Sequence, residues 1–588
     1  MIQIRPYVLL PLLLLAGQPF QARSQAAGAN QAGASQVPAN QAGANQDRPS
    51  QDVRKTLTVR HGAVVSASSL ASEAGLAILR RGGNAIDAAI TTQLVLAVVF
   101  PGAGNIGGGG FMIAHFAGGR SLALDYREKA PGKASRDMYI DSSGKARTDW
   151  SQKGHLACGV PGTIAGMFAA HRYGRLPFAS LIQPAIDLAE HGFVLSASEA
   201  DNLNKTRSVF IQCNTGPIAF VKDLPWKAGD TLVQKDLAAT LRRIRDKGVK
   251  GFYEGPTADY IVDEMRRGGG LISKEDLEQY SAKERPALSF PYKSYTVLTM
   301  PMPSSGGVLL GMMLNMVENR PALREGYASA AATQLMVEAE RRAFADRAAY
   351  MGDPDFVKVP VATLLSPAYL SRRMRDFTPG KAGSSKLTGA GPIPPESTET
   401  THFDVIDAQG NCVSVTTTLN GWYGCKTVAG KAGFLLNNEM DDFSIKPGVP
   451  NMFGAVGGTA NAIAPGKRML SSMTPTIVLK NGKPFLVAGT PGGTTIPTSV
   501  FQTLVDIIDF HLSTKDAVDL PKFHHQWLPD EVDLEKGFPD STAAALTRMG
   551  YTIRQLPAIG RTEVIKVLPD GSYEAVADER GDDAASGW

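Results

Sequence analysis

The chain has 588 residues, of which 43% are hydrophobic and 20% are charged. This composition predicts a globular protein with a sizeable hydrophobic core and excludes a wholly disordered chain. The 60 basic and 56 acidic residues give a net charge of +4, and no cluster of basic side chains stands out. That balance argues against nucleic acid as a partner.

Residues 1–26 have the three parts of a secretory signal peptide. Arg5 gives a charged start, YVLLPLLLLAG is a short apolar core, and Ser24-Gln25-Ala26 is a small-residue cleavage site. The apolar core is too short to span a bilayer comfortably, and no cysteine follows it to carry a lipid anchor. We therefore expect a soluble, exported protein, periplasmic or secreted, with an uncleaved membrane anchor as the alternative.

Residues 27–52 repeat QAGANQ-like units with almost no large apolar residues, which predicts a disordered leader outside the fold. The folded part is expected to begin near Val64. Residues 68–81 predict an amphipathic helix with one apolar side, made by Leu70, Ala74, Ala77 and Ile78. Residues 84–100 predict a second helix, with Asn84 as its N-cap.

Gly102, Gly104 and Gly107 satisfy the G-x-G-x-x-G pattern of dinucleotide-binding loops. That fingerprint needs a strand before it and a helix after it. Here a predicted helix precedes it and the strand-like GFMIAHF follows. We interpret these glycines as positions where backbones pack closely.

The middle of the chain reads mainly as scaffold. Residues 121–126 predict a strand that ends at Arg127, and residues 160–380 are mostly helical in pattern. Residues 379–399 are rich in Gly, Pro, Ser and Thr, which predicts a flexible loop.

Residues 401–406 and 411–418 predict a β-hairpin, because apolar and polar side chains alternate in both. A three-residue turn with Gly410 in the left-handed conformation is a favoured connection, and it makes the numbers of paired residues sum to 818. In this register Thr400 faces Thr418, so two hydroxyl groups lie side by side. A slip of one residue would destroy the pairing.

A threonine hydroxyl becomes a useful nucleophile only when a base takes its proton. An N-terminal threonine can use its own α-amine, whose pKa is about 7.7–8.0. Thr400 could do so only after cleavage of the Glu399–Thr400 bond. From the hairpin alone, an ordinary strand threonine is the alternative interpretation.

The chain resembles the γ-glutamyltranspeptidases (glutathione hydrolases) over about residues 55 to 588. In the second half the resemblance rests on ETTHFDVIDAQGNCVSVTTTLN, LLNNEMDDFSIKPGVPN, MLSSMTPTIV and AGTPGG. In the first half it rests on GGNAIDAAI, PGAGNIGGGGFM, LDYREKAPG, GVPGTIAGM and MPMPSSGG. These motifs fall in the family's order, which makes the resemblance very specific.

The resemblance implies an α/β (α+β) fold of the N-terminal-nucleophile hydrolase type, a four-layer αββα sandwich. It also implies a precursor that cuts itself before Thr400 into a large subunit, residues 53–399, and a small catalytic subunit, residues 400–588. The two pieces are expected to stay together, because their separation would expose a shared core. No cofactor and no metal are expected.

The resemblance also assigns roles to residues that have ordinary interpretations by themselves. Such residues usually provide surface charge, turns or strand-to-helix connections. Catalytic roles are implied for Thr400, Thr418, Gly492 and Gly493, with the two glycines as an oxyanion hole worth about 3–4 kcal/mol per donor. Binding of the substrate's α-carboxylate is implied for Arg127, Ser471 and Ser472, and binding near its α-amino group for Asn420, Glu439 and Asp442.

Residues 446–454 match the family's lid loop, with Phe453 where some members carry Tyr. A Phe side chain cannot donate a hydrogen bond to Asn420, although the loop could still act as a mobile lid. His524 and His525 are adjacent and have no ligand cluster nearby, so we interpret them as structural.

Four cysteines occur, at positions 158, 213, 412 and 425. Their spacing matches no metal motif. Buried free thiols are the default interpretation. A Cys412–Cys425 disulfide remains open, since export would permit it.

The expected function is transfer of a γ-glutamyl group from glutathione or glutamine to water, an amino acid or a dipeptide, through an ester on Thr400. One alternative is an amidase of the same fold with another acyl group, such as a cephalosporin or glutaryl acylase. Another is an uncut exported binding or scaffold protein.

Overall fold

The computed structural model describes residues 54–390, 401–446, 448–454 and 458–588. The predicted signal peptide and leader, at 1–52, and the predicted cleavage site, Glu399–Thr400, lie outside the described residues. The same is true of residues 391–399 of the loop predicted at 379–399.

Two seven-stranded sheets form the centre of the fold. The first contains, in spatial order, β19 (Ala584–Gly587), β2 (Ala63–Ser66), β10 (Thr401–Ile406), β11 (Cys412–Thr418), β3 (Gly109–His115), β4 (Ser121–Asp125) and β7 (Lys283–Arg285). The second contains β1 (Thr56–Val59), β18 (Tyr573–Val576), β17 (Glu563–Val567), β13 (Lys483–Gly489), β12 (Thr476–Lys480), β9 (Tyr295–Thr299) and β8 (Leu288–Tyr292). Neighbouring strands in both sheets are antiparallel.

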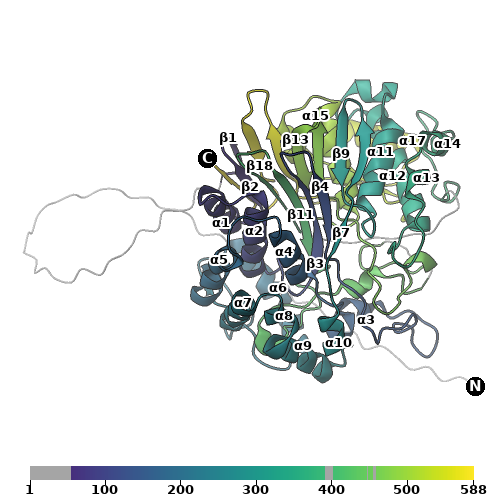
Figure 1. The fold of residues 1–588 in the computed structure, drawn as a ribbon. Coiled ribbons are helices and arrows are strands. Elements are labelled where there is room, and N and C mark those ends of the chain that lie inside the picture. Colours follow the sequence, from purple (N-terminus) through teal and green to yellow (C-terminus); the bar gives the residue numbers. More distant parts are fainter. Residues whose placement is uncertain (1–53, 391–400, 447, 455–457) are drawn as a thin grey trace, which may run out of the picture. The chain divides into compact units, whose positions relative to one another are not determined.

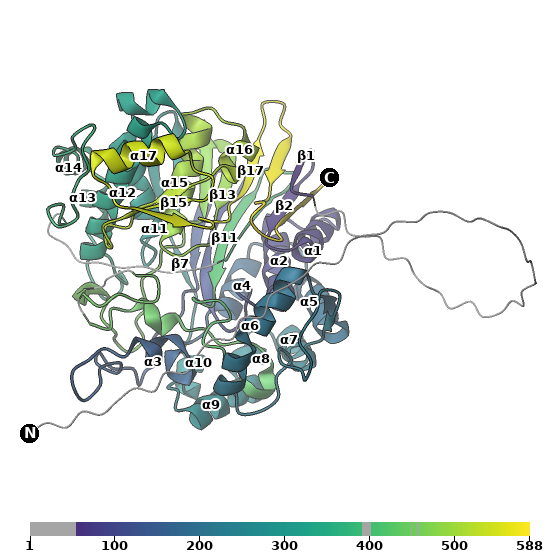
Figure 2. The same ribbon diagram turned by 180° about the vertical axis from the view of Figure 1, so that it is seen from behind.

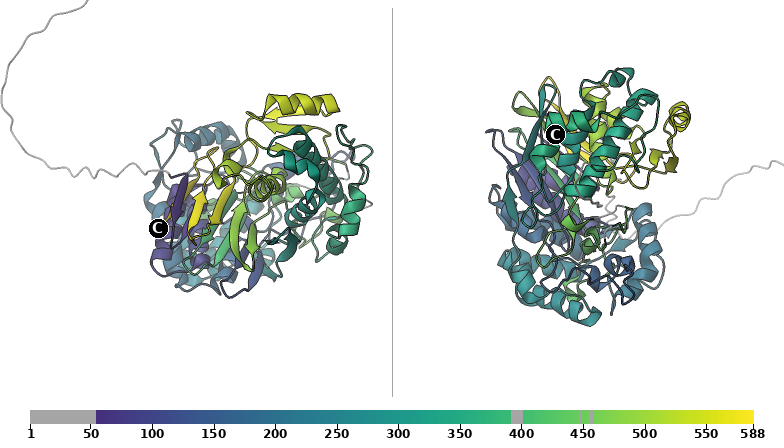
Figure 3. Two further views of the ribbon diagram at one scale, coloured as in Figure 1. Left: turned by 90° about the horizontal axis from the view of Figure 1, so that it is seen from above. Right: turned by 90° about the vertical axis from the view of Figure 1, so that its right-hand side faces the viewer.

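Helices cover the outer face of each sheet, as Figures 1 and 2 show from opposite sides. The first sheet packs against α1 (Ser69–Arg80), α2 (Ala85–Val99), α4 (Thr163–His171) and α5 (Phe178–His191). The second packs against α11 (Gly306–Val317), α12 (Ala330–Tyr350), α15 (Thr495–Ile508) and α16 (Thr514–Asp519). The two helical layers lie on opposite sides of the strands (Figure 3).

Apolar side chains fill the space between the layers. Phe111, Ile113, Ile406, Ile477 and Val487 belong to a buried cluster contributed by strands of both sheets. Two larger clusters are present, one between the first sheet and its helices and one between the second sheet and its helices. This arrangement confirms the four-layer αββα sandwich, in which both faces of the central strands are buried.

The remaining elements are short or peripheral. The helices are α3 (Thr148–Gln152), α6 (Ala197–Cys213), α7 (Lys235–Lys247), α8 (Lys250–Tyr253), α9 (Gly255–Gly268), α10 (Lys274–Glu278), α13 (Val361–Leu364), α14 (Pro367–Arg373) and α17 (Asp540–Met549). The strands are β14 (Phe523–His524), β15 (Val532–Glu535) and β16 (Ile553–Leu556) in one small sheet, and β5 (Phe193–Val194) and β6 (Thr231–Leu232) in another.

The first two predicted helices are confirmed as α1 and α2. Asn84 Oδ1 accepts a hydrogen bond from the Asp87 N–H, and Asp87 Oδ2 accepts one from the Asn84 N–H, both at 3.0 Å. The apolar side predicted for α1 is partly wrong, since Ala77 is exposed and Ala71 and Gly75 are buried. Small residues let α1 lie close to α2, so they bury without being strongly apolar.

The mainly helical pattern predicted for residues 160–380 is wrong at 283–299. This segment forms β7, β8 and β9, and β9 pairs with β12 inside the second sheet. Its β-branched and aromatic residues favour an extended chain, a signal that the surrounding helices obscure in a long window.

The glycines at 102–107 are where backbones meet, as predicted. A Cβ on Gly104 would lie 2.2 Å from the carbonyl oxygen of Leu96, and one on Gly107 would lie 2.1 Å from that of Leu435. The backbone oxygen of Gly107 also accepts hydrogen bonds from Asn437, from its N–H at 3.2 Å and from Nδ2 at 2.9 Å. Gly107 therefore joins the first half of the chain to the second.

We predict that Gly107→Ala destabilises the protein by about 1–3 kcal/mol, because neither backbone can move away from the added methyl group. Gly118→Ala is the matched control, since nothing lies within 4 Å of a Cβ built there. Thermal melting followed by circular dichroism measures both. Equal melting temperatures for the two variants would contradict this account of Gly107.

Candidate active site

The predicted hairpin register is confirmed for every described pair. Thr401 pairs with Thr417, Phe403 with Val415, and Ile406 with Cys412, so the paired numbers sum to 818. Gly410 has φ +81°, and the Asp407 N–H donates to the Asn411 oxygen at 3.1 Å. Thr400 itself lies outside the described residues, so its partner remains a prediction.

The end of β11 is held by buried polar side chains from the first half of the chain. Thr417 Oγ1 accepts hydrogen bonds from Gln93 Nε2 at 2.7 Å and from Asn105 Nδ2 at 3.1 Å. Asn105 Nδ2 also donates to the Thr418 carbonyl at 2.7 Å. Thr418 Oγ1 accepts the N–H of Asn420 at 2.6 Å, which fixes the chain just after the strand. The hydroxyl predicted to support Thr400 therefore has a defined position.

Arg127, Glu439 and Asp442 come together as a buried ion cluster. The two guanidinium Nη atoms of Arg127 donate to Glu439 Oε1 and Asp442 Oδ2, and all three side chains are fully buried. Arg127 follows β4, whereas Glu439 and Asp442 begin and end one 3-10 turn. The predicted surface-charge alternative for the acidic pair is therefore wrong.

The backbone fixes the guanidinium in place. Arg127 Nε donates to the Met469 oxygen at 3.2 Å, and Nη2 donates to the Leu470 oxygen at 3.1 Å. Since Ser471 follows directly, these bonds bring the arginine next to the predicted serine pair. Glu128 Oε2 lies 3.5 Å from Arg127 Nη1 and adds a third carboxyl group to the cluster.

Burial controls the ionisation of this cluster. It raises the pKa of Glu439 to about 7, although the charge of Arg127 acts in the opposite direction. It also raises the pKa of Asp442 well above its ordinary value. Burial disfavours the charge of Arg127, but Glu439 and Asp442 outweigh it and raise the pKa of the guanidinium. The arginine stays charged, while Glu439 can take up a proton near neutral pH.

Besides both carboxyl oxygens of Glu128, three buried oxygens at this cluster have no hydrogen-bond partner among the described residues: Glu439 Oε2, Asp442 Oδ1 and Asn420 Oδ1. Asn420 has φ +71° and donates from Nδ2 to the Asn438 oxygen at 3.0 Å, next to Glu439. Buried acceptors without donors are costly. The three oxygens are suited to a cationic group with several N–H donors.

The predicted serine pair is anchored by residues that the sequence did not single out. Arg347 donates from Nη2 to Ser472 Oγ at 2.8 Å and from Nε to Ser305 Oγ at 2.7 Å. Ser305 Oγ in turn donates to the Ser471 carbonyl at 2.7 Å. The serines at 304–305 and Arg347 on α12 thus position 471–472. A buried arginine within a helix otherwise built as scaffold is the signal that could have found it.

Gly492 and Gly493 form the tight turn predicted between β13 and α15. Their φ angles are +134° and +66°, in the region where glycine is favoured, and their carbonyl oxygens accept from the N–H groups of Thr495 and Ile496. The turn precedes the N-terminus of α15, where backbone N–H groups and the helix dipole favour negative charge.

His402 and Asp404 form a buried pair beneath this turn that sequence reasoning missed. His402 Nε2 lies 2.9 Å from Asp404 Oδ1, and Nδ1 lies 3.0 Å from Thr416 Oγ1. A Cβ on Gly489 would lie 2.2 Å from the His402 ring, so the ring packs directly against the strand that leads to Gly492. Burial raises the pKa of Asp404. An i, i+2 His–Asp pair on one strand face was the available signal.

The predicted lid loop contacts Asn420 through Met452 rather than Phe453. Asn420 Nδ2 lies 3.9 Å from Met452 Sδ, and the Met452 N–H donates to Asp441 Oδ2 at 3.0 Å. The backbone oxygen of Phe453 accepts from Gln526 Nε2 at 3.3 Å. The missing tyrosine hydroxyl is thus replaced by a weaker sulfur contact.

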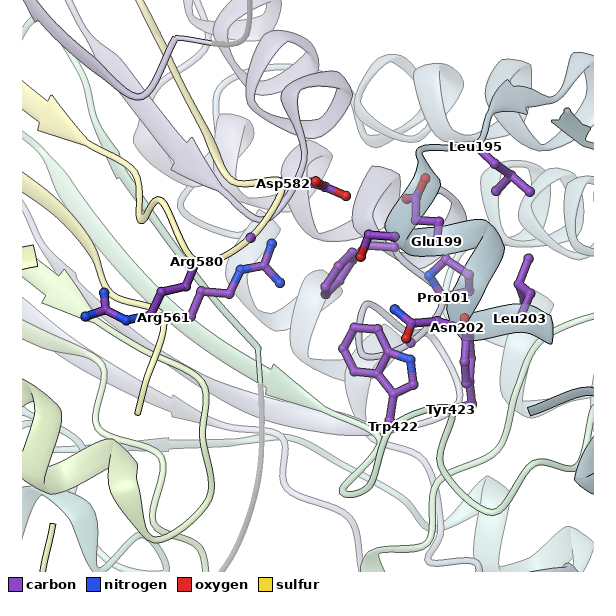
Figure 4. Close-up of a pocket in the computed structure, with 14 residues that line it drawn as sticks. Pro101, Leu195, Glu199, Asn202, Leu203, Trp422, Tyr423, Arg561, Arg580 and Asp582 are labelled. Carbon is purple, nitrogen blue, oxygen red and sulfur yellow. The ribbon is translucent and has the colours of Figure 1, made fainter. Parts of the chain in front are cut away.

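A cavity of about 120 Å³ is lined by residues of α6 and of the segments around Trp422 and Arg561 (Figure 4). Figure 4 shows Asn202, on α6, beside the ring of Trp422, with Arg561 on the opposite side. The N–H of Arg561 donates to Thr490 Oγ1 at 2.7 Å, which connects the cavity wall to the glycine turn. Trp422 and Tyr423 are wall residues of this cavity.

The two adjacent histidines make separate buried contacts. His524 Nδ1 lies 2.9 Å from Thr498 Oγ1, whereas the His525 N–H donates to Glu340 Oε2 at 2.8 Å. Burial lowers the pKa of His525 to about 4. Across the described parts of the chain, no group of three His, Cys, Asp or Glu residues is arranged to hold a metal ion.

All four cysteines are free thiols. The neighbour of Cys425 is Cys158, with the two Sγ atoms 3.4 Å apart. Cys412 belongs instead to the cluster between the two sheets. The structure therefore gives no support to the Cys412–Cys425 pair that the sequence left open.

Comparisons with known proteins agree with this geometry. The sequence model of a family described as Gamma-glutamyltranspeptidase matches residues 71–588. The glutathione hydrolase proenzyme of Escherichia coli is 46% identical over 543 residues, covering 92% of this chain and 94% of that protein. A cephalosporin acylase from Bacillus halodurans has TM-score 0.81 at 27% identity, covering 92% and 98%. A γ-glutamyltranspeptidase chain from Helicobacter pylori has TM-score 0.54 at 44% identity, covering 56% and 94%.

We predict that Arg127→Met destabilises the protein by about 3–5 kcal/mol, because it leaves two carboxyl groups buried without a cation. The triple variant Arg127→Met, Glu439→Gln, Asp442→Asn should recover part of this loss. Arg136→Met is the control, since its ion pair with Asp137 is solvent-exposed. Urea unfolding compares the four proteins, and a single variant as stable as the control would refute the role of the cluster in stability.

Proposed function

The chain belongs to the γ-glutamyltranspeptidase family, and from this premise we propose that it is a γ-glutamyltransferase and glutathione hydrolase that activates itself by cleaving before Thr400. The observation that carries the proposal is the buried Arg127–Glu439–Asp442 cluster, together with the open oxygens beside it. It offers opposite charges within one small site.

A γ-glutamyl group has a free α-ammonium and a free α-carboxylate, whereas a glutamate within a peptide chain has neither. We assign the ammonium to Glu439, Asp442 and the Asn420 amide oxygen. The carboxylate then binds Arg127 with Ser471 and Ser472. Substrate binding would redistribute the ion pairs that the cluster makes alone, since an ammonium can replace part of the guanidinium's contact with the two carboxylates.

The confirmed hairpin register supports Thr400 as the nucleophile. Continued by one residue, the pairing of Thr401 with Thr417 brings Thr400 opposite Thr418. In the proposed activation, the Thr400 hydroxyl attacks the Glu399 carbonyl, and the C–N bond between the two residues breaks, which gives an ester and frees the Thr400 α-amine. Hydrolysis of the ester then releases the Glu399 carboxylate and restores the Thr400 hydroxyl. That amine then serves as the base for its own hydroxyl.

In the proposed reaction, the Thr400 hydroxyl attacks the γ-amide of glutathione or glutamine. The Gly492 and Gly493 N–H groups stabilise the oxyanion of the tetrahedral intermediate. Its collapse releases the amine and leaves a γ-glutamyl ester on Thr400. Water resolves the ester in hydrolysis, and an amino acid or dipeptide resolves it in transfer. Thr418 holds the nucleophile in place by hydrogen bonding.

Activation would yield a large piece ending at Glu399 and a small piece starting at Thr400. Both pieces contribute strands to both sheets, which supports their staying together. We propose export to the periplasm or the medium, on the strength of the signal-like residues 1–26. Among the described residues, no helix is long and apolar enough to cross a membrane.

An amidase acting on another acyl group is the second candidate, and the similarity to a cephalosporin acylase supports testing it. A glutaryl group has the same chain length as a γ-glutamyl group but lacks the amine. The cluster favours the γ-glutamyl substrate, because Glu439 Oε2 and Asp442 Oδ1 would remain without a donor beside a glutaryl group.

We predict that Thr400→Ala remains one uncut chain with no measurable turnover of a γ-glutamyl anilide, because alanine has no hydroxyl group. Thr401→Ala is the matched control and should still be cut. Denaturing gel electrophoresis and N-terminal sequencing of the smaller fragment give the readout. Normal cleavage of Thr400→Ala, or full activity of an uncut wild-type chain, would overturn the assignment.

We predict that kcat/KM for a γ-glutamyl anilide, divided by kcat/KM for a glutaryl anilide, rises with pH through about 7. Burial raises the pKa of Glu439 to about that value, so the carboxylate that binds an ammonium forms only as the pH increases. The ratio cancels the titration of the Thr400 amine, which both substrates share. Glu439→Gln should give a flatter ratio, and an unchanged slope in that variant would contradict this role for Glu439.

A further inference from the structure

Three of the four cysteines, Cys158, Cys213 and Cys425, lie in one region. Cys158 and Cys425 are 1% and 0% exposed, and their Sγ atoms are 3.4 Å apart. Cys213, the last residue of α6, is partly exposed, and its backbone oxygen accepts from Thr427 Oγ1 at 3.2 Å. The sulfur pair connects two segments that are far apart in the sequence.

The backbone holds both sulfur-bearing residues in place. The Gly154 N–H donates to the Cys425 oxygen at 3.0 Å, and one 3-10 turn, His155–Ala157, separates Gly154 from Cys158. The Cys425 N–H donates to the Leu436 oxygen at 3.0 Å. A disulfide has an S–S length of about 2.05 Å, so each sulfur needs to move by only about 0.7 Å, which a small side-chain rotation can supply.

The environment of the pair favours thiol–disulfide exchange. Burial opposes ionisation of Cys425, but hydrogen bonds from Cys158 and Thr427 lower the pKa of Cys425 to about 7. Burial and the contact with Cys425 raise the pKa of Cys158. Cys425 is therefore the thiolate and Cys158 the thiol, which is the division of roles that such exchange requires.

We propose that Cys158 and Cys425 form a disulfide that covalently joins the two pieces of the cleaved protein. Cys158 precedes the proposed cut at Glu399–Thr400 and Cys425 follows it. The bridge between the pieces thus rests on the proposed function, whereas the disulfide itself does not.

The oxidant is an external disulfide, either a small molecule or the active-site disulfide of an oxidising protein. The Cys425 thiolate attacks one of its sulfurs, forms a mixed disulfide and releases one thiolate. The Cys158 sulfur then attacks the Cys425 sulfur and releases the second, while the two protons of the cysteines end on the two released thiols. Since both sulfurs are buried in the fold, the segments around them have to open for the external disulfide to reach Cys425.

The other two cysteines provide controls. Cys412 belongs to the cluster between the sheets, and its Sγ lies 3.6 Å from the Gly410 oxygen. Burial raises the pKa of Cys213, and the nearby Cys425 raises it further, so Cys213 is the competing partner that the test must distinguish.

The test uses the full chain, exported to an oxidising compartment and quenched with N-ethylmaleimide. On a denaturing gel without reductant we expect one band with the mass of the two pieces together, and with reductant two bands. Cys158→Ser and Cys425→Ser should give two bands in both lanes. Cys213→Ser and Cys412→Ser should behave as the wild type.

Peptide mapping without reductant gives a readout that does not depend on the cut or on the variants. Digestion with trypsin and chymotrypsin separates Cys412 from Cys425, and we expect a linked peptide pair containing Cys158 and Cys425. Two bands without reductant, with both thiols alkylated, would overturn the proposal, as would a Cys213–Cys425 pair. One band in both lanes together with the expected linked peptides would instead refute the cut and retain the disulfide.

Discussion

The buried contact between Arg127 and the carboxyl groups of Glu439 and Asp442 is the interaction on which the site depends. It places one cation from the first half of the chain against two acidic side chains from the second half, all out of contact with water. Removing charge from solvent is expensive, so the cluster persists only because backbone oxygens and several opposite charges surround the guanidinium. As a result, positively and negatively charged groups are held in fixed positions within a small volume before any substrate binds.

A second constraint is the position of the hairpin in the middle of the first sheet. Its strands are flanked by β2 on one side and β3 on the other, so neither can shift register without disrupting four strands. The polar end of β11 is further held by Gln93 and Asn105 from the first half of the chain. A nucleophile at this hairpin would be held in position by the whole sheet rather than by a loop.

Much of this was predictable from the sequence, for definite reasons. The hairpin register followed from alternation and a single glycine, because period and turn geometry determine it locally. The capped helix at Asn84 and the close approach at Gly107 were also local signals. The acidic pair was assigned only through family resemblance, since spacing alone does not distinguish a surface pair from a buried one.

What sequence reasoning missed depends on contacts between distant segments. Arg347 reads as one charged residue of a long helix until the fold brings it to Ser305 and Ser472. The His402 ring packs against Gly489 of the second sheet, which is almost 90 positions away in the sequence. Strands β8 and β9 were overlooked because their surroundings are helical and their partner, β12, comes much later in the chain. Strands that pair across such a long stretch of sequence leave no local pattern in the sequence.

The interleaved order of the strands has a consequence for how such a protein can arise. Residues after position 400 supply β10, β11 and β19 to one sheet and β12, β13, β17 and β18 to the other, while earlier residues supply the rest. Neither segment could fold alone without leaving unpaired strand edges, which invite aggregation. If two separate genes encoded these segments, the two chains would have to find each other while they fold. A single continuous chain avoids this requirement, so the proposed break in the backbone has to follow assembly.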